Sequence, residues 1–477
     1  MESVAQAQVR LSRLAGEDPV RRLAAAFAEA GEELALVGGP VRDAFLGRDG
    51  IDLDFTTSAH PDRILELVKP LASAHWDIGR AFGTIGAIVD GEQVEITTYR
   101  ADVYAEHSRK PEVEFGDSLI GDLRRRDFTV NALALRLPGL RLEDVGSGFE
   151  DLLAKRLVTP IAAEESFGAD PLRMLRAARF TSQLGFTVSD EVREAMVAMA
   201  DRLDIISAER IRDELTKLLR TPNPRPGLEL LVDTGLAERF LPELPALRKA
   251  VDAAHRHKDV YEHSLMVLQQ AIDLETARRT DPDAEPDVVV RLAALLHDIG
   301  KPATRKFEKD GSVSFHHHDV VGAKMTKARL RELRYDNDTV KAVARLVELH
   351  QRFFGYSEGG WTDSAVRRYV RDGGELLERL HILTRADVTS RNARKVARLQ
   401  RAYDDLEQRI RELQEQEALE AVRPDLDGTQ IMAILGIKPG REVGEAYKML
   451  LEARLDEGPL GPEEAERRLR EWWASRG

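Results

Sequence analysis

The sequence predicts an α+β N-terminal domain, with a mixed sheet and helices, followed by domains that are mostly α-helical. Two observations support this fold class. Between about residues 33 and 136, short runs typical of β-strands alternate with helical stretches, as in a sheet domain. The runs are ELALVGG, IDLDFTT, TIGAIVD, QVEITTY and FTVNALAL. From residue 151 onward, helical periodicity dominates to the end of the chain. Because 477 residues exceed what one hydrophobic core usually organises, several domains are expected.

Shifts in pattern along the chain predict four domains. The sheet domain is expected over residues 20–150, and a helical domain over 151–250, with a break between helices at 222–227 (PNPRPG). A histidine-rich helical domain is expected over 251–395, and a charged helical tail over 396–477.

Composition excludes several classes of protein. Hydrophobic residues make up 43% of the chain and charged residues 32%, which argues against disorder and against a fibrous repeat. No apolar run is long enough to span a bilayer, and the first residues lack a signal-peptide pattern, so we expect a cytoplasmic protein with no membrane partner. The absence of cysteine excludes thiolate ligands, so any metal must be held by carboxylates and imidazoles.

The formal net charge of −13 does not exclude a nucleic-acid partner, because such binding needs only a local basic surface. Three clusters of basic residues could supply one. They are Arg124–Arg126, the set Arg173, Arg176 and Arg179, and the stretch from Arg391 to Arg401. The alternative for each cluster is a solvated helix face.

The segment LVGGPVRDAFLGRDGIDLDFTT, residues 36–57, predicts a phosphate-binding turn. An apolar strand leads into Gly38 and Gly39, where the lack of side chains lets the backbone approach a phosphate. The following helix N-terminus adds oriented N–H groups. Arg42 falls in the first turn of that helix, where its guanidinium could bind the same phosphates.

Asp52 and Asp54 follow directly, two positions apart in a β-type run, so both side chains are expected on one face of a strand. Two carboxylates this close would repel each other unless a cation lay between them, which predicts a Mg²⁺ site. Two such ions promote in-line phosphoryl transfer. A third carboxylate is expected from a neighbouring strand, and Glu95 in QVEITTYR is the candidate. The alternative is a pair of strand-end aspartates with no metal.

These residues resemble the polymerase-β-like nucleotidyltransferases, specifically the bacterial class II CCA-adding enzyme and poly(A) polymerase family, over about residues 33–245. The segment DLRRRDFTVNALAL is similar to the family's RRDFTINA segment. The resemblance implies that Arg126 contacts the nucleotide, with Asp127 and Asn131 organising the sugar side. The segment EDVGSGFEDLLAKRL resembles the hinge between the family's head and neck domains.

The segment ADPLRMLRAARF looks like the family's nucleobase-reading helix. Asp170, Arg173, Arg176 and Arg179 recur every three residues, so they are expected along one helical stripe. By resemblance, Asp170 and Arg173 would imitate a pairing edge for C and A, while Arg176 and Arg179 would face phosphates. The family usually carries Glu where this chain has Ala169, which puts only a supporting acidic partner in doubt.

A second set of chemistry-bearing residues lies in the histidine-rich region. His297 and Asp298 follow the apolar stretch VVVRLAALL, so they are expected to be buried and satisfied by something other than water. The other candidates lie on separate helical segments: His263, one of the three consecutive histidines His316, His317 and His318, His350 and Asp387. Imidazole and carboxylate ligands suit Mn²⁺, Co²⁺, Ni²⁺, Zn²⁺ or Fe, and five or six ligands suggest two metals.

This set resembles the HD-superfamily phosphohydrolase domain that some bacterial CCA-adding enzymes carry. The resemblance implies that the ligands are His263, His297, Asp298, His318, His350 and Asp387. It also implies hydrolysis of 2′,3′-cyclic or terminal phosphates of RNA or nucleotides. Lys301 is expected either to contact a substrate phosphate or to be a surface residue.

The resemblance therefore implies an enzyme that adds CCA to the tRNA 3′ end from CTP and ATP with Mg²⁺, and that does not act on DNA. The HD site would hold Mn, Ni, Co or Fe. Two alternatives stay open: a poly(A) polymerase acting on generic RNA, and an RNA-binding or nucleotide-sensing protein in which only the HD site works. The tail, from about Asp427, resembles a tRNA-body contact, with simple packing as the alternative.

Overall fold

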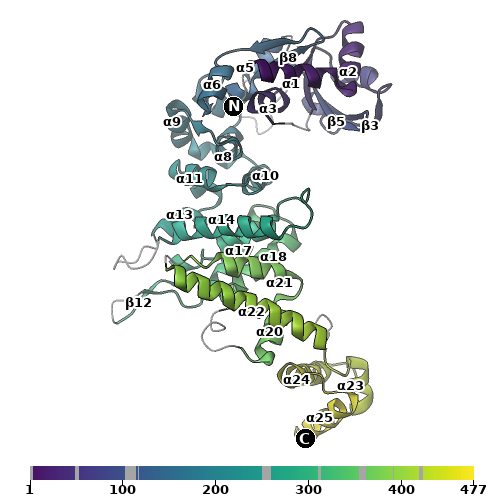
Figure 1. Cartoon of the computed structure of the whole chain (residues 1–477), viewed down its shortest axis with the longest axis vertical. Coiled ribbons are helices and arrows are strands. Elements are labelled where there is room, and N and C mark those ends of the chain that lie inside the picture. The colour runs from purple at the N-terminus through teal and green to yellow at the C-terminus, as the bar shows by residue number, and fades with distance from the viewer. Residues whose placement is uncertain are drawn as a thin grey trace. The chain divides into compact units, whose positions relative to one another are not determined.

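The computed structural model describes residues 4–48, 53–101, 114–116, 118–249, 259–309, 313–353, 361–389, 392–417 and 423–476 (Figure 1). Asp52 and Arg391 lie outside these ranges. The chain divides into two compact units, residues 1–242 and 243–477, and each is considered by itself. The four domains expected from the sequence stay a prediction, since the expected first and second domains fall within one unit.

A seven-stranded mixed sheet forms the centre of the N-terminal unit, in the order β3-β4-β5-β2-β1-β8-β9. Its strands are β1 (Leu34–Val37), β2 (Leu53–Thr57), β3 (Ala72–Trp76), β4 (Thr84–Val89), β5 (Glu92–Thr98), β8 (Leu133–Leu137) and β9 (Arg141–Asp144). Strands β2 and β5 are parallel, and the other neighbouring pairs are antiparallel. The shorter strands pair as β6 (Arg100–Ala101) with β7 (Glu114–Phe115) and β10 (Arg156–Leu157) with β11 (Thr187–Val188).

Helices pack on both faces of the sheet, because its central strands place apolar side chains on each face. Leu36 and Phe55 are buried on the face where helices α2 (Asp18–Glu29) and α4 (Pro61–Val68) pack. Ala35 and Val37 face the other way and pack with Leu119 and Leu123 of α5 (Leu119–Arg124). The remaining helices of this part are α1 (Val4–Gly16), α3 (Gly39–Leu46) and α6 (Gly148–Ala154).

The rest of the N-terminal unit is helical. Its elements are α7 (Ala163–Ala169), α8 (Leu172–Leu184), α9 (Asp190–Ala198), α10 (Ala208–Leu219), α11 (Arg225–Asp233) and α12 (Ala237–Phe240). Helix α8 packs against both α10 and α11. Its approach to α11 requires Gly227, since a Cβ there would lie 2.3 Å from the carbonyl oxygen of Ala178.

The described residues of the C-terminal unit form helices and one short hairpin, β12 (Lys306–Phe307) with β13 (Val313–Ser314). The helices are α13 (Glu243–Ala246), α14 (Val260–Arg278), α15 (Val288–Leu296), α16 (Lys301–Thr304), α17 (His318–Glu332), α18 (Asn337–Leu349), α20 (Asp363–Gly373), α21 (Leu377–Ala386), α22 (Ala393–Glu417), α23 (Gly428–Leu435), α24 (Arg441–Glu457) and α25 (Pro462–Ala474). Helices α14, α15, α18 and α21 pack together, and α23 to α25 form a separate small core.

The predicted fold class is confirmed, and the structure corrects three details of it. Strands β3 and β9 were not predicted, because neither has an apolar alternation that stands out in the sequence. Residues Thr129–Asn131 form a 3₁₀ turn rather than the start of a strand. The predicted continuous helix around Pro171 is two helices, because a residue before proline disfavours the helical conformation and Asp170 is extended (φ −146°, ψ 98°).

Among the described residues, no helix has both the length and the apolar character needed to cross a bilayer.

Candidate active sites

Two of the three predicted catalytic carboxylates lie on neighbouring strands. In the parallel pair of β2 and β5, Asp54 is the register partner of Glu95. Adjacent strands are about 4.8 Å apart, so both carboxylates leave the same face of the sheet close together. Asp54 is half-buried and Glu95 is exposed. Asp52 falls outside the described residues, so the structure provides two of the three oxygen ligands that the Mg²⁺ prediction requires.

The predicted phosphate-binding turn lies at the end of β1, the strand beside β2. Gly38 has φ +70°, a conformation that favours glycine, and its N–H donates to the carbonyl of Leu133. A Cβ at Gly38 would lie 3.4 Å from Nη1 of Arg126, so this arginine lies directly beside the turn. Gly39 begins α3. The structure thus brings together the glycine turn and the arginine that the resemblance assigns to the nucleotide.

Arg42, which was expected to bind phosphates, is hydrogen-bonded to protein side chains in the structure. Its guanidinium donates to both carboxylate oxygens of Asp43, at 2.8 and 3.0 Å, and to Oδ1 of Asn131 at 2.7 Å. Only 6% of Arg42 is exposed. Direct contact with a triphosphate would require these bonds to be exchanged, so Arg42 in this structure fixes the helix to the Asn131 segment, and its phosphate contact stays a prediction.

Asp127 is the centre of a buried polar network. Its carboxylate accepts hydrogen bonds from the Phe128 N–H at 2.8 Å, from Nδ2 of Asn131 at 3.0 Å and from Nε of Arg176 at 2.7 Å. Burial opposes ionisation, but the adjacent Arg176 guanidinium and the Asn131 amide hold the pKa of Asp127 at about 2. The network therefore ties the 3₁₀ turn of the sheet domain to α8.

Arg176 and Arg179, which were expected to face phosphates, are paired with carboxylates. Arg179 donates to Glu214 of α10 at 2.7 Å and lies 4.1 Å from the ring centre of Phe180. Nη1 of Arg176 lies 3.8 Å from the same Glu214. Because Glu214 is buried between the two guanidiniums, it compensates both charges. These contacts position α8, and a phosphate contact by either arginine stays a prediction.

The two predicted base-reading residues, Asp170 and Arg173, do not both lie on one helix as the sequence predicted. Asp170 precedes α8, and its carboxylate accepts from the Leu172 N–H at 3.1 Å and from Arg210 at 2.8 Å. Arg173 donates to Oγ of Ser166 at 2.8 Å and to the carbonyl of Arg125. Arg173 thereby joins α8 to the residue next to Arg126, so the segment predicted to read the base lies beside the arginine predicted to contact the nucleotide.

Sequence reasoning missed Asp122 and Arg100, which lie on the same face of the sheet. Buried Asp122 accepts from Oγ1 of Thr56 at 3.2 Å and from the backbone N–H of Arg100 at 3.3 Å, and it pairs with Arg125 and Arg126. Burial, followed by the charge of Arg125, lowers the pKa of Arg100 to about 10. In the sequence around Asp122, only the neighbouring arginines indicated a function. Nothing there distinguished Asp122, which pairs with these arginines, from an ordinary surface acid.

In the C-terminal unit, the six predicted HD ligands converge at the ends of five helices. They fall into two groups whose ligand atoms lie within 4.8 Å of one another: His263, His297 and Asp387, and Asp298, His318 and His350. His297, His350 and Asp387 each directly follow the last residue of a helix, and His318 begins one.

Hydrogen bonds to Nδ1 fix the orientation of all four rings. Nδ1 of His297 lies 2.9 Å from the carbonyl oxygen of Ala294, and Nδ1 of His318 lies 2.7 Å from that of Phe315. Nδ1 of His350 lies 2.6 Å from the carbonyl oxygen of Val347, and Nδ1 of His263 lies 2.9 Å from Oγ1 of Thr389. A ring that donates Nδ1–H presents the lone pair of Nε2 to a metal. The Nε2 atoms of His263 and His297 are 3.2 Å apart, which suits two ligands of one cation.

Asp298 connects the two groups of ligands. Its Oδ2 lies 3.3 Å from Nε2 of His297, and its Oδ1 lies 3.3 Å from Nε2 of His318. Burial opposes ionisation, but the neighbouring His297 and Lys301 hold the pKa of Asp298 well below its ordinary range. Burial lowers the pKa of His350 to about 4, so this ring is neutral at neutral pH, as metal binding requires. The residues present fit divalent cations: His263, His297 and Asp387 would hold one, and Asp298, His318 and His350 another.

The neighbouring polar residues have defined positions. Lys301 donates to Oδ2 of Asp298 at 2.6 Å with 21% of its side chain exposed, and its contact with a substrate phosphate stays a prediction. His316 and His317 are exposed and belong to neither ligand group. Gln351 was not predicted, although its Nε2 lies 2.9 Å from Nε2 of His318. Its position directly after a ligand was the only available signal.

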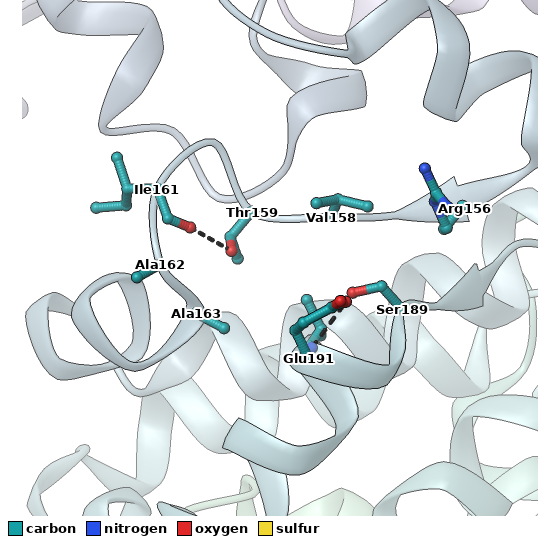
Figure 2. A pocket seen from close by; sticks show the side chains of 9 residues that line it. Arg156, Val158, Thr159, Ile161, Ala162, Ala163, Ser189 and Glu191 are labelled. Atoms are coloured by element: carbon teal, nitrogen blue, oxygen red, sulfur yellow. Dashed lines mark hydrogen bonds between the residues drawn. The ribbon is translucent and has the colours of Figure 1, made fainter.

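A separate cavity of about 310 Å³ lies in the N-terminal unit, away from the residues above (Figure 2). Its lining includes Arg156, Thr159, Ser189 and Glu191, around the start of α9. The hydroxyl of Thr159 donates to the Ile161 carbonyl at 2.6 Å, a bond drawn as a dashed line in Figure 2. The side chains of Arg156, Thr159 and Ser189 are hydrogen-bonded to neighbouring residues, and none of the predicted site residues lines the cavity.

Three regions of the chain match models of known protein families. Residues 34–158 match the poly A polymerase head domain, residues 185–247 match the probable RNA and SrmB-binding site of polymerase A, and residues 260–392 match the HD domain. An A-adding tRNA nucleotidyltransferase of Deinococcus radiodurans is 38% identical over 449 residues, which cover 92% of this chain and 95% of that protein.

Two further comparisons cover most of the chain. A CC-adding tRNA nucleotidyltransferase of Thermus thermophilus is 32% identical over 447 residues, 92% of this chain and 93% of that protein. The crystal structure of the Bacillus stearothermophilus CCA-adding enzyme in complex with CTP has a similar fold, with a TM-score of 0.69 and 24% identity, covering 96% of this chain and 99% of that one.

Proposed function

The chain belongs to the tRNA nucleotidyltransferase family, and from this premise we propose that it completes the tRNA 3′ end by adding CCA from CTP and ATP without a nucleic-acid template. The observation that carries the proposal is the pairing of Asp54 with Glu95 beside the Gly38 turn and Arg126. Carboxylates next to a phosphate-binding turn are what nucleotidyl transfer requires. We place this activity in the cytoplasm.

Each group in the proposed site has a distinct task. Asp54, Glu95 and, by the sequence pattern, Asp52 would hold Mg²⁺, which when bound activates the 3′-hydroxyl and stabilises the leaving pyrophosphate. Arg126 and the Gly38 backbone bind the triphosphate. Asp127 and Asn131 hold the sugar side through the network described above. Asp170 and Arg173 select the base through hydrogen bonds.

A second candidate is the addition of A alone to tRNA that already ends in CC. The relative from Deinococcus radiodurans favours it, since that protein is named as an A-adding enzyme and matches almost the whole chain. A third candidate is poly(A) synthesis on generic RNA, which the name of the matching head-domain model favours.

The test is incorporation of labelled CTP and ATP, with Mg²⁺, onto tRNA transcripts that end at the discriminator base, after C and after CC. Addition that stops at CCA on all three transcripts supports CCA addition. Addition of A to the CC transcript alone supports the second candidate. Long ATP-only tails on any RNA support the third. The absence of any incorporation would contradict all three and leave the HD site as the working part.

We also propose that the C-terminal unit is a phosphohydrolase acting on 2′,3′-cyclic or terminal phosphates at RNA 3′ ends. The support is the pair of ligand groups bridged by Asp298. Mn, Ni, Co or Fe bound there would supply an activated hydroxide. The test is hydrolysis of RNA ending in a 2′,3′-cyclic phosphate after chelation and reloading with each metal. Hydrolysis that is equal with and without metal would contradict the proposal.

A further inference from the structure

A row of four residues crosses the sheet from its edge strand to the proposed catalytic strand. Trp76 of β3 is the register partner of Gly86 in β4, Gly86 is the partner of Glu95 in β5, and Glu95 is the partner of Asp54 in β2. Side chains of residues directly opposite each other leave the same face of a sheet. Trp76 therefore stands on the face that carries the two carboxylates.

The indole of Trp76 lies so close to Gly86 that there is no room for a side chain there. A Cβ at Gly86 would lie 2.1 Å from Nε1 and 2.2 Å from Cε2 of the indole. Gly86 is buried under the ring, and the ring itself is half-exposed. Because neighbouring strands are about 4.8 Å apart, the ring lies roughly one strand from Glu95.

The free face of the ring has no role in the packing described so far. Within the ranges that the structure describes, no aromatic ring, cation or hydrogen-bond acceptor is paired with the indole of Trp76. Trp76 also ends the edge strand, and the turn after it carries the exposed side chains of Ile78 (89%) and Phe82 (51%). A rigid, half-exposed aromatic ring beside catalytic carboxylates is suited to stack on a nucleobase.

The geometry of nucleotidyl transfer indicates whether Trp76 would stack on the base of the incoming nucleotide or on the base at the primer end. Groups assigned to the incoming nucleotide, Gly38 and Arg126, lie on the β1 side of Asp54. In an in-line displacement the attacking 3′-hydroxyl and the leaving pyrophosphate lie on opposite sides of the phosphorus. The primer must then approach over β5 and β4, the side on which Trp76 lies.

We propose that the indole of Trp76 is a stacking platform for the 3′-terminal base of the RNA primer, and that Gly86 is there to let the ring lie against the sheet. The inference rests on the proposed function, because it takes the Asp54 and Glu95 site to be the transfer site. Stacking accepts every base, so one platform serves successive primer ends as the chain grows.

The test compares the full-length wild type with Trp76→Ala, Trp76→Phe and Gly86→Ala in steady-state addition of A to a tRNA transcript ending in CC. Trp76→Ala should raise KM for the tRNA about tenfold, with KM for ATP and kcat at saturating tRNA unchanged. Trp76→Phe should restore most of the affinity, since a ring remains. Gly86→Ala should resemble Trp76→Ala because the new Cβ displaces the indole. Val197→Ala, which truncates another exposed apolar side chain of the same unit, is the matched control.

Two results would overturn the platform: an unchanged KM for tRNA in Trp76→Ala, or a rise in KM for ATP instead. Tryptophan fluorescence quenching by the same tRNA, without ATP, gives a readout independent of transfer. In Trp76→Phe, the quenching due to Trp76 should be lost while the affinity for tRNA is kept. In Trp76→Ala, the affinity for tRNA should fall. If the wild type transfers no nucleotide, the proposed function fails, and tRNA binding alone decides the platform: equal affinities of wild type and Trp76→Ala, measured from the anisotropy of a fluorescently labelled tRNA, refute it.

Discussion

Replacement of Asp127 by Asn removes the charge at the centre of the buried network that joins the sheet domain to α8. The variant keeps the shape of the side chain but presents an amide N–H to the guanidinium of Arg176, which donates to the wild-type carboxylate at 2.7 Å. The pKa of Asp127 falls from the ordinary 3.8 to about 2, against the opposing effect of burial. At about 1.4 kcal/mol per pH unit, this corresponds to roughly 2 kcal/mol of stabilisation by the charged form.

The stabilisation has a defined pH dependence. Because the folded pKa is depressed, the contribution is fully present above pH 4 and is lost as the pH falls towards 2. In the variant, the Arg176 guanidinium keeps the longer pairing to Glu214 at 3.8 Å and its position over the Phe180 ring, 5.4 Å from the ring centre. We therefore expect Asp127→Asn to destabilise the packing of α8 by about 2 to 4 kcal/mol between pH 5 and 8.

Hydrogen exchange followed by mass spectrometry on the full chain measures this loss locally. A cost of 2 kcal/mol predicts exchange of the α8 amides, Leu172–Leu184, that is roughly 30-fold faster. Asp201→Asn, at an exposed acid of the same unit, should leave those amides unchanged. Equal protection of α8 in Asp127→Asn and wild type at pH 7 would refute the reasoning, as would an effect of the same size in the control.

Three further predictions concern the two proposed sites. Asp54→Ala should abolish nucleotide transfer and keep phosphodiester hydrolysis, while His297→Ala should do the reverse; a folded single variant that loses both activities would contradict two independent sites. Arg173→Ala should relax the preference for CTP and ATP over UTP and GTP, measured as kcat/KM for the four nucleotides, and unchanged selectivity would argue against base reading by this residue. Gly300→Ala should weaken metal binding at least about tenfold in calorimetric titration, because its Cβ would lie 2.1 Å from the carbonyl oxygen of His318 and displace that ligand; retained affinity would show that the ligand helix can shift freely.

Much of the candidate chemistry could be predicted because it depends on local spacing. The alternation of a β-strand places residues two apart on one face, and this accounts for the prediction of Asp54 as an active-site carboxylate. The apolar run before His297 and Asp298 predicted their burial, which the structure confirms. In both cases the relevant neighbours are a few residues away, so the backbone geometry of one element is sufficient.

Other features could not be predicted because they depend on residues far apart in the chain. The arginines of α8 have the spacing of a phosphate-binding stripe, yet Arg176 and Arg179 pair with Asp127 and Glu214, 49 and 35 positions away. Whether an arginine is available to a ligand depends on whether folding brings a carboxylate to it. In the same way, Asp122 had no local signal of its role in organising Arg126.

The sequence by itself determined the fold class and predicted the types of ligand, since these follow from composition and short-range periodicity, while the order of the motifs came from the resemblance to the family. Tertiary structure alone decided that β2 pairs with β5 and so joins Asp54 to Glu95, and that Asp298 bridges two sets of ligands. It also decided that Trp76 lies over Gly86, a contact that no local pattern indicates. The physical reason is that strand order, register and helix packing depend on burying the apolar faces of all elements together, which no single segment of the sequence specifies.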